Sequence, residues 1–235
     1  MNLLLFTQAD KTAENLLQLT GQRCEHLHKV LRAKVGDTLR IGEVNGLMGT
    51  GEILSIEPGA AVLQIELQDT PPPKLPVTLV VALPRPKMLR RILRTSAEMG
   101  VAHLHLINSY RVEKSYWQTP VLAKDSIRGY LLQGLEQARD TVLPEIHIHT
   151  RFKPFAEDEL PALSEDRQAF LAHPGDYPPF TGSLTDESVL VIGPEGGFIP
   201  YEVEKLEHAG CAPISLGPRI LRVENAVTSL LGKFF

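Results

Sequence analysis

The hydrophobic and polar positions of residues 1–70 follow a pattern that is mostly typical of β-strands. Strands are expected at Thr38–Ile41, Leu47–Ile56 and Val62–Leu67, and the Asn45-Gly46 pair is a hairpin signal between the first two. One helix, around Gln22–Arg32, interrupts the strands. A short segment with this pattern predicts a small β-barrel.

A run of prolines follows, at Pro71, Pro72, Pro73 and Pro76. Consecutive prolines form a stiff spacer that fits neither the interior of a helix nor that of a sheet. We therefore predict a barrel domain over residues 1–70, a linker over 71–76 and a second domain over 77–235.

Beyond the linker, buried apolar runs alternate with helical patterns. The expected strands are Val77–Leu83, His103–Ile107, Glu145–His149, Ala169–Ala172, Ser188–Ile192 and Pro213–Leu216. The expected helices are Lys87–Met99, Val121–Ala138, Pro200–Gly210 and Val223–Phe234. This alternation predicts an α/β domain with a mostly parallel sheet covered by helices. The proline-interrupted stretch Arg151–Asp186 gives the least readable pattern.

Apolar runs and cysteines narrow the class of protein. No apolar run approaches the ~20 residues of a membrane span, and the N-terminus lacks the features of a signal peptide. Cys24 and Cys211 make no disulfide framework, and the histidines near them match no zinc-ligand spacing. We expect a soluble, cytoplasmic protein that binds no membrane and no metal.

Charge is unevenly distributed along the chain. A formal net charge of −4 argues against a nucleic-acid binder, but basic residues gather in the segments 21–40 and 84–94. Salt confines the field of a charge to about 10 Å, so a local basic patch can still neutralise phosphates. The residues predicted to contact RNA are Arg23, His26, Lys29, Arg32, Arg85, Lys87, Arg90, Arg91 and Arg94.

Each of the two basic segments is predicted to contain part of a helix. Lys87, Arg90, Arg91 and Arg94 share one face at the start of a helix, where cations are disfavoured unless phosphates offset them. In the first segment, Leu27, Val30 and Leu31 are expected on the buried face and His26, Lys29 and Arg32 on an exposed one. The alternative is that both are merely solvated faces.

Two glycine-containing loops follow predicted strands. In the first, Gly193, Gly196 and Gly197 stand between a buried strand and a helix start, where backbone can approach a ligand closely. No Gly-Lys-Ser/Thr follows, so this is not a P-loop, and it is not the Gly-x-Gly-x-x-Gly of a dinucleotide fold. A plain tight turn is the alternative.

The second loop, Leu216–Ala226, contains Gly217-Pro218 and places Arg219, Arg222 and Glu224 beside a helix start. Two such loops at adjacent strand ends predict a concave site at the carboxyl edge of the sheet. A simple helix N-terminus would explain Glu224 but not the arginines. His147 and His149, alternating on one strand, are predicted to be ordinary strand residues rather than ligands.

Together these residues resemble the RsmE family, SPOUT-class methyltransferases that modify N3 of a uridine in small-subunit ribosomal RNA. The matching pieces are His26–Arg32 with Gly36-Asp37, Glu98–Val101, Glu136-Gln137, Leu171–Pro174, Ile192–Phe198 and Leu216–Glu224. The two glycine loops at this separation are specific in combination.

The resemblance implies a PUA-like RNA-binding barrel and a SPOUT domain tied in a trefoil knot. It also implies a homodimer that methylates 16S ribosomal RNA of the small subunit, with S-adenosylmethionine (SAM) bound by the knot loops. The implied cofactor residues are Leu171, Ala172, His173, Ile192, Gly193, Glu195, Gly196, Gly197, Leu216, Gly217, Ile220 and Leu221. For catalysis we assign Arg222 to oxyanion stabilisation or phosphate binding, and Glu224 as the base or as the residue that orients Arg222.

Three departures from the family pattern fall where substrate would be handled. They are Pro84–Lys87 in place of Pro-Lys-Gly-Asp, Asp140 in place of an arginine, and Val223 and Asn225 in place of threonines. Three alternatives therefore stay open: a methyltransferase for another rRNA or tRNA nucleotide, a non-catalytic RNA-binding ribosome-assembly factor, and a small-molecule α/β enzyme using Glu195.

Overall fold

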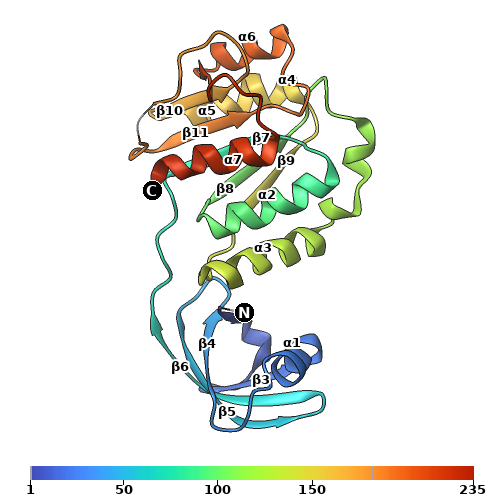
Figure 1. The fold of residues 1–235 in the computed structure, drawn as a ribbon, viewed down its shortest axis with the longest axis vertical. Coiled ribbons are helices and arrows are strands. Elements are labelled where there is room, and N and C mark those ends of the chain that lie inside the picture. The colour runs from blue at the N-terminus through green and yellow to red at the C-terminus, as the bar shows by residue number, and fades with distance from the viewer. Residues whose placement is uncertain (1, 182) are drawn as a thin grey trace. The chain divides into compact units, whose positions relative to one another are not determined.

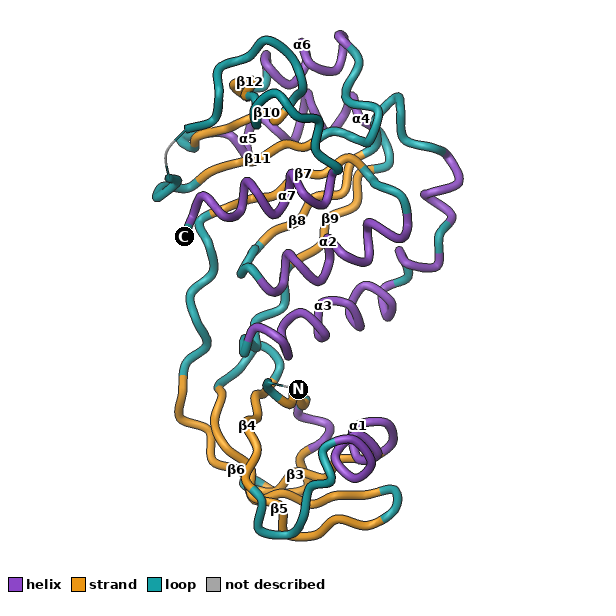
Figure 2. Tube along the Cα trace, viewed as in Figure 1, coloured by secondary structure: helices purple, strands orange, loops and turns teal. Residues whose placement is uncertain are grey.

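The computed structural model describes residues 2–181 and 183–235. The chain forms two compact units, one of Met1–Pro73 with Leu135–Leu143 and one of Lys74–Gly134 with Pro144–Phe235. Figure 2 shows that strands predominate in the first unit and alternate with helices in the second. Within the described residues, no helix is both long enough and apolar enough to cross a membrane.

The first unit is built on one sheet, in the order β1-β4-β5-β6-β3-β2. Its strands are β1 (Leu4–Phe6), β2 (Lys11–Ala13), β3 (Leu16–Thr20), β4 (Thr38–Glu43), β5 (Met48–Glu57) and β6 (Ala60–Asp69). Short helical turns lie at Gln8–Asp10 (3-10), Gly21–Glu25 (α1) and His26–Val30 (π). β1 pairs with β4 in parallel, and the other pairs are antiparallel.

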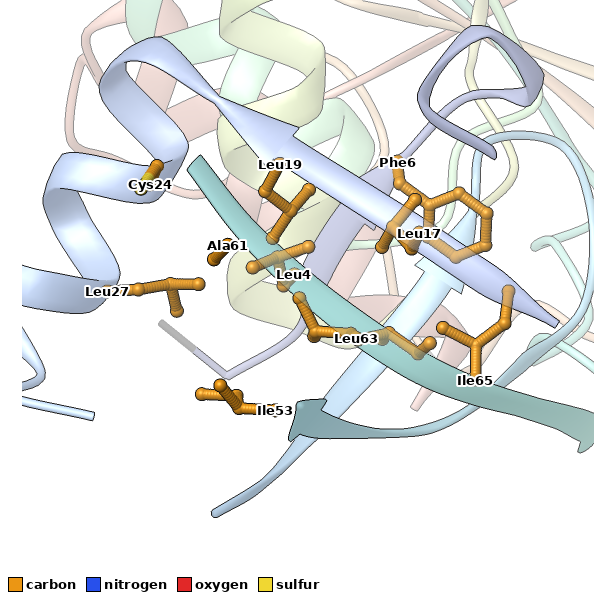
Figure 3. Close-up of a cluster of buried hydrophobic side chains, with 11 residues drawn as sticks. Leu4, Phe6, Leu17, Leu19, Cys24, Leu27, Ile53, Ala61, Leu63 and Ile65 are labelled. Carbon is orange, nitrogen blue, oxygen red and sulfur yellow. The ribbon is translucent and has the colours of Figure 1, made fainter. Parts of the chain in front are cut away.

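The core of this unit follows the strand alternation. On β6, Ala61, Leu63 and Ile65 are buried while Gln64 and Glu66 between and beyond them are exposed, as the two-residue period requires. Figure 3 shows these side chains meeting those of β1, β3 and the first helix. Burial of each large apolar side chain stabilises the unit by about 1.5–3 kcal/mol.

In the predicted helix around Gln22–Arg32, the expectation that Leu27, Val30 and Leu31 share a buried face is wrong. Leu27 is fully buried, but Val30 is 65% exposed and Leu31 is 40% exposed. The α-helical hydrogen bonding widens here to a π-helix, in which the Leu31 N–H donates to the His26 carbonyl at 3.0 Å. Residues three and four apart then no longer share one face.

The second unit is built on a parallel sheet, in the order β12-β10-β11-β7-β8-β9. Its strands are β7 (Val77–Ala82), β8 (His103–Ile107), β9 (Glu145–His149), β10 (Gln168–Ala172), β11 (Ser188–Ile192) and β12 (Ala212–Ile214). Its α-helices are α2 (Pro86–Glu98), α3 (Lys124–Ala138, which ends in the segment assigned to the first unit), α4 (Phe152–Pro154), α5 (Leu160–Ser164), α6 (Pro200–His208) and α7 (Val223–Leu231). Lys114–Gln118, Pro120–Leu122 and Gly232–Phe234 are 3-10 turns, and Phe155–Glu159 is a π-helical turn. The predicted α/β fold with a mostly parallel sheet is confirmed.

Helices cover both faces of this sheet. α2 and α7 contact each other across one face, and α5 lies against β11 on the other (Figure 1). Every residue of β7 and β11 is therefore buried, which explains their unbroken apolar runs. Because the paired strands are parallel, the loops after β7, β8, β10, β11 and β12 all leave from one carboxyl edge.

Candidate active site

A pocket of about 410 Å³ opens at this carboxyl edge, between the loops that follow β10, β11 and β12. The predicted cofactor residues that line it are Ala172, His173, Ile192, Gly193, Glu195, Gly197, Leu216, Gly217, Ile220 and Leu221. Leu171 is fully buried in β10, and Gly196 is exposed beside the pocket. Three loops that are far apart in sequence thus meet at one site.

The glycine loop after β11 is shaped by close packing. A Cβ atom on Gly193 would lie 3.1 Å from the ring of Phe198, which is buried. Gly197 adopts φ +73°, a conformation that favours glycine, and its N–H donates to the Pro194 carbonyl at 2.8 Å. The loop therefore folds tightly and presents backbone to the pocket.

Arg111, in the loop after β8, contacts this glycine loop at Gly196. Its guanidinium donates a hydrogen bond to the Gly196 carbonyl, and its Cδ lies 3.0 Å from where a Cβ atom of Gly196 would be. Burial and the charge of Arg111 lower the pKa of His173. Both effects favour the uncharged form of the His173 imidazole, which lines the pocket.

Glu202, in the first turn of α6, holds the loop of Arg111 in place. Its side chain is 2% exposed. Oε1 accepts the Tyr110 N–H at 2.7 Å, and Oε2 accepts the Ser109 hydroxyl and the Ile199 N–H, each at 3.1 Å. A carboxylate is favoured at a helix N-terminus, and here it ties together the loops after β8 and β11.

The patterns in the sequence did not indicate Arg111, Ser109, Tyr110 or Glu202. The signal for Glu202 was its place three residues after Ile199 at the start of a predicted helix, a capping position. Arg111 gave no signal, because only the fold brings it to the glycine loop.

Comparison with known proteins decides the class of this site. Residues 71–234 match the family described as RNA methyltransferase domain. The chain belongs to this RNA methyltransferase family. A protein of Treponema pallidum named ribosomal RNA small subunit methyltransferase E is 28% identical over 232 residues, covering 96% of this chain and 87% of its own length. A protein of the same name from Synechocystis is 26% identical over 235 residues, covering 97% and 76%.

Solved structures share the fold of the whole chain. Ribosomal RNA small subunit methyltransferase E from Neisseria gonorrhoeae, bound to S-adenosyl methionine, gives a TM-score of 0.77 at 18% identity and covers 98% of this chain and 95% of that one. A Legionella pneumophila protein in complex with the cofactor SAM gives a TM-score of 0.75 at 22% identity, covering 99% and 96%. Family membership favours the methyltransferase prediction over the small-molecule enzyme and the non-catalytic factor.

The two residues predicted to act in catalysis flank the start of α7 in this RNA methyltransferase. Arg222 is the exposed N-cap residue, and its carbonyl accepts the Ala226 N–H at 2.9 Å. The Glu224 side chain is 12% exposed, and its Oε1 lies 3.6 Å from Nη1 of Arg91 on α2. Among the described residues no ion pair joins Arg222 to Glu224, and the Glu224 carboxylate lies next to Arg91.

Some basic side chains of α2 pack against other residues, and others are exposed to solvent. Arg94 lies 4.9 Å from the centre of the Tyr130 ring and donates from Nε to Gln133 at 2.7 Å. Arg90 lies 6.0 Å from the same ring. Lys87 and Arg85 are exposed, and the Arg85 N–H donates to Oε1 of Glu195 at 3.1 Å.

The basic residues of the first unit are also partly engaged. Arg23 forms a two-pronged pair with Asp10, which lowers the pKa of Asp10 to about 2. Lys29 lies 3.4 Å from Glu25. Among the described residues, Nε2 of His26 is buried with no hydrogen-bond partner, whereas Arg32 is exposed with φ +50°.

Asp140, the departure that replaces an arginine, is a buried turn residue. It is 3% exposed, and its Oδ1 accepts the Val142 N–H at 2.9 Å. It lies in the segment Leu135–Leu143, which belongs to the first unit. Val223 is buried at the start of α7 and Asn225 is exposed.

Proposed function

We propose that this chain is a SAM-dependent methyltransferase that methylates N3 of a uridine in 16S ribosomal RNA of the small subunit. The observation that carries the proposal is the pocket at the carboxyl edge, where the loops predicted to bind SAM converge in a member of an RNA methyltransferase family. The relatives named ribosomal RNA small subunit methyltransferase E support the substrate.

The residues of the pocket fit SAM. A volume of about 410 Å³ is in the range of small-molecule sites. Ile192, Leu216 and Leu221 would supply apolar surface to the bound cofactor, and the glycine loop would supply backbone polar groups. The lowered pKa of His173 favours its uncharged form, which would suit a pocket that binds a cationic cofactor.

SAM supplies an electrophilic methyl group, so the protein has to align it with a nucleophile and activate that nucleophile. Uridine N3 carries a proton and becomes nucleophilic only when this proton leaves. Glu224, shielded from solvent and next to Arg91, accepts that proton. The exposed Arg222 cation stabilises the negative charge that develops on the uracil oxygens, or holds the adjacent phosphate.

The remaining parts of the proposal concern architecture and partners. The domain predicted over residues 1–70, which the segment Leu135–Leu143 completes, serves as a PUA-like RNA-binding domain, and the SPOUT domain predicted over 77–235 is tied in a trefoil knot around the pocket loops. Ile220, which lines the pocket and is 83% exposed, supports an apolar contact in a homodimer. The exposed Lys29, Arg32 and Lys87 contact the RNA backbone, and the enzyme acts in the cytoplasm.

The test is methyl transfer from labelled SAM to small ribosomal subunits that lack the modification, followed by nucleoside analysis. We expect labelled 3-methyluridine. SAM binding without transfer would contradict the proposed nucleotide and point to another RNA target. Absence of SAM binding would overturn the enzymatic proposal as a whole.

Arg222→Ala tests the catalytic assignment within the same assay. We expect SAM affinity close to that of the wild type and a turnover lowered at least about a hundredfold, because the charge is needed only as the transition state forms. Arg128→Ala, an exposed arginine on α3, is the control. Equal losses of SAM affinity and turnover in Arg222→Ala would contradict the assignment.

A further inference from the structure

A group of histidines lies on one face of β8 and β9, away from the pocket. The parallel register places His103 beside Glu145 and His105 beside His147, and His149 follows on the same face. His103 and Glu145 are the first residues of their strands. His103, Glu145 and His147 therefore lie toward the amino edge of the sheet, with His149 at the other end of β9, whereas the pocket lies at the carboxyl edge.

Two of these histidines satisfy each other. Nδ1 of His149 lies 3.1 Å from Oε1 of Glu159, and Nε2 of His149 lies 3.0 Å from Nδ1 of His105. A carboxylate only accepts, so Nδ1 of His149 donates to Glu159, and a proton on either Nε2 of His149 or Nδ1 of His105 makes the second hydrogen bond. His105 is 6% exposed and is held in one orientation by this chain of hydrogen bonds.

The other two histidines leave their nitrogens open around one carboxylate. Oε2 of Glu145 lies 3.5 Å from Nδ1 of His103 and 3.8 Å from Nε2 of His147. These three atoms all lie within 4.8 Å of one another. The distances to Glu145 are too long for good hydrogen bonds, but a shared ion at the centre would bring all three atoms into its coordination shell.

His147 gives the second, independent indication of a ligand. Its Nε2 atom is buried and has no hydrogen-bond partner among the described residues. A buried polar atom without a partner is uncommon and calls for an explanation, and a bound ion or water is one. The His147 ring is also fixed, because it stacks on His105 with ring centres 4.3 Å apart.

We propose that His103, Glu145 and His147 bind a divalent transition-metal ion of the Zn²⁺ class. Two imidazole nitrogens and one carboxylate oxygen are ligands that Zn²⁺ accepts, and Mg²⁺ and Ca²⁺ prefer oxygen alone. A neighbouring cavity of about 450 Å³, lined by His103 and His147, gives access for the ion and for the water that completes its coordination. His105, which is hydrogen-bonded to His149, stacks on the His147 ring and so fixes the orientation of this ligand.

The ion would join β8 to β9, the outermost strand of the sheet. Binding to the folded state alone raises the free energy of unfolding. Such an ion would stabilise the folded sheet, and its binding does not depend on the proposed methyltransferase activity.

Isothermal titration with Zn²⁺ on the full-length, metal-stripped protein, free of any polyhistidine tag, tests the site. We expect one ion per chain and a raised thermal midpoint. Glu145→Gln, an exposed substitution that keeps the shape of the side chain, and His147→Ala should each lower the affinity by more than about tenfold. His28→Ala, an exposed histidine of the first unit, is the matched control and should bind as the wild type does.

Binding of Co²⁺ provides a second readout. Its absorption spectrum should show nitrogen and oxygen ligands without a thiolate charge-transfer band. A thiolate band would overturn the proposal, because it would place the ion at Cys24 or Cys211. Unchanged Zn²⁺ affinity in folded Glu145→Gln, or no binding by the wild type at millimolar Zn²⁺, would also overturn it.

Discussion

At the level of single residues, the buried carboxylate of Glu202 shapes the pocket although it does not line it. Glu202 satisfies three donors from two loops, and through Ser109 and Tyr110 it sets the position of Arg111 on the glycine loop. The shape of the pocket thus depends on a residue behind its wall.

Glu202→Ala should be strongly destabilising. It leaves the buried Ser109 hydroxyl and the partly buried Tyr110 and Ile199 N–H groups without their acceptor, at up to about 1–3 kcal/mol for each donor. We expect a loss of about 3 kcal/mol in the free energy of unfolding, measured in urea, and weaker SAM binding. Glu204→Ala, an exposed carboxylate on the same helix, should change neither. Equal stability of the two variants would refute the role of Glu202.

The Asp10–Arg23 pair makes the stability of the first unit depend on pH. Because Arg23 lowers the pKa of Asp10 from 3.8 to about 2, the ionised pair stabilises the fold above the unfolded pKa and is lost as pH falls towards 2. We expect about 1–2 kcal/mol at pH 7, after allowance for solvent screening of the half-exposed Arg23.

Asp10→Asn measures this contribution. Its free energy of unfolding should fall below that of the wild type at neutral pH, and the difference should shrink steadily as the pH is lowered through the acid range. Asp69→Asn, exposed at the end of β6, serves as the control. A difference that is independent of pH would mean that the pair contributes through packing rather than charge.

At the scale of elements, α3 contains two glycines with opposite surroundings. A Cβ atom on Gly134 would lie 2.5 Å from the carbonyl oxygen of Arg94 and 2.8 Å from Cβ of Ala97, both on α2. On Gly129 it would meet nothing within 4 Å. Gly134 therefore permits the close approach of two helices, whereas Gly129 only costs helix propensity.

The two alanine substitutions should change stability in opposite directions. Gly134→Ala forces the helices apart and should lower the free energy of unfolding by about 1–3 kcal/mol. Gly129→Ala should raise it by about 0.5–1 kcal/mol. Chemical denaturation of the two variants beside the wild type measures both, and a stabilising Gly134→Ala would contradict the packing of α2 on α3.

Elements with a strong local pattern were predictable from sequence. His103–Ile107, Glu145–His149 and Ser188–Ile192 have the predicted bounds, because a buried parallel strand needs an unbroken apolar run or a clear alternation. The strands β1 and β2 were missed, since three residues carry no readable period, and β3 (Leu16–Thr20) was missed although its burial alternates. The π-helical turn was missed because it breaks the period on which the prediction rests.

Both glycine loops of the pocket were predictable from their amino-acid composition. In the structure they line the same pocket. Arg111 and the pair of His103 and His147 could not be found this way. Their relation exists only through strand order and register, which place residues distant in sequence side by side.

At the scale of the whole molecule, the first unit is not one continuous stretch of chain. The Asn45 N–H donates to the Thr141 carbonyl at 2.8 Å, and the Thr141 hydroxyl donates to the Gly46 carbonyl at 2.6 Å. The side chain of Asn2 donates to the Gln137 carbonyl at 2.9 Å. The segment Leu135–Leu143 therefore completes this unit.

A fragment of residues 1–73 should accordingly fold poorly by itself. It lacks Thr141, whose Cγ2 lies 2.5 Å from where a Cβ atom of Gly42 would be, and so it exposes apolar surface at β4. We expect a low or absent thermal transition by circular dichroism, and partial recovery when a peptide of residues 135–143 is added. A fragment that melts at the temperature of the intact unit would contradict this.

This interrupted order also has a consequence for synthesis. A unit made of one stretch can fold as soon as it leaves the ribosome, since domains generally fold from the N-terminus during translation. Here the barrel strands are completed only after Leu143 has been made, when residues 74–134 of the second unit have already been synthesised and residues 144–235 have not. A nick in the proline-rich segment of the finished protein would leave residues 1–73 attached to the segment Leu135–Leu143 by noncovalent contacts.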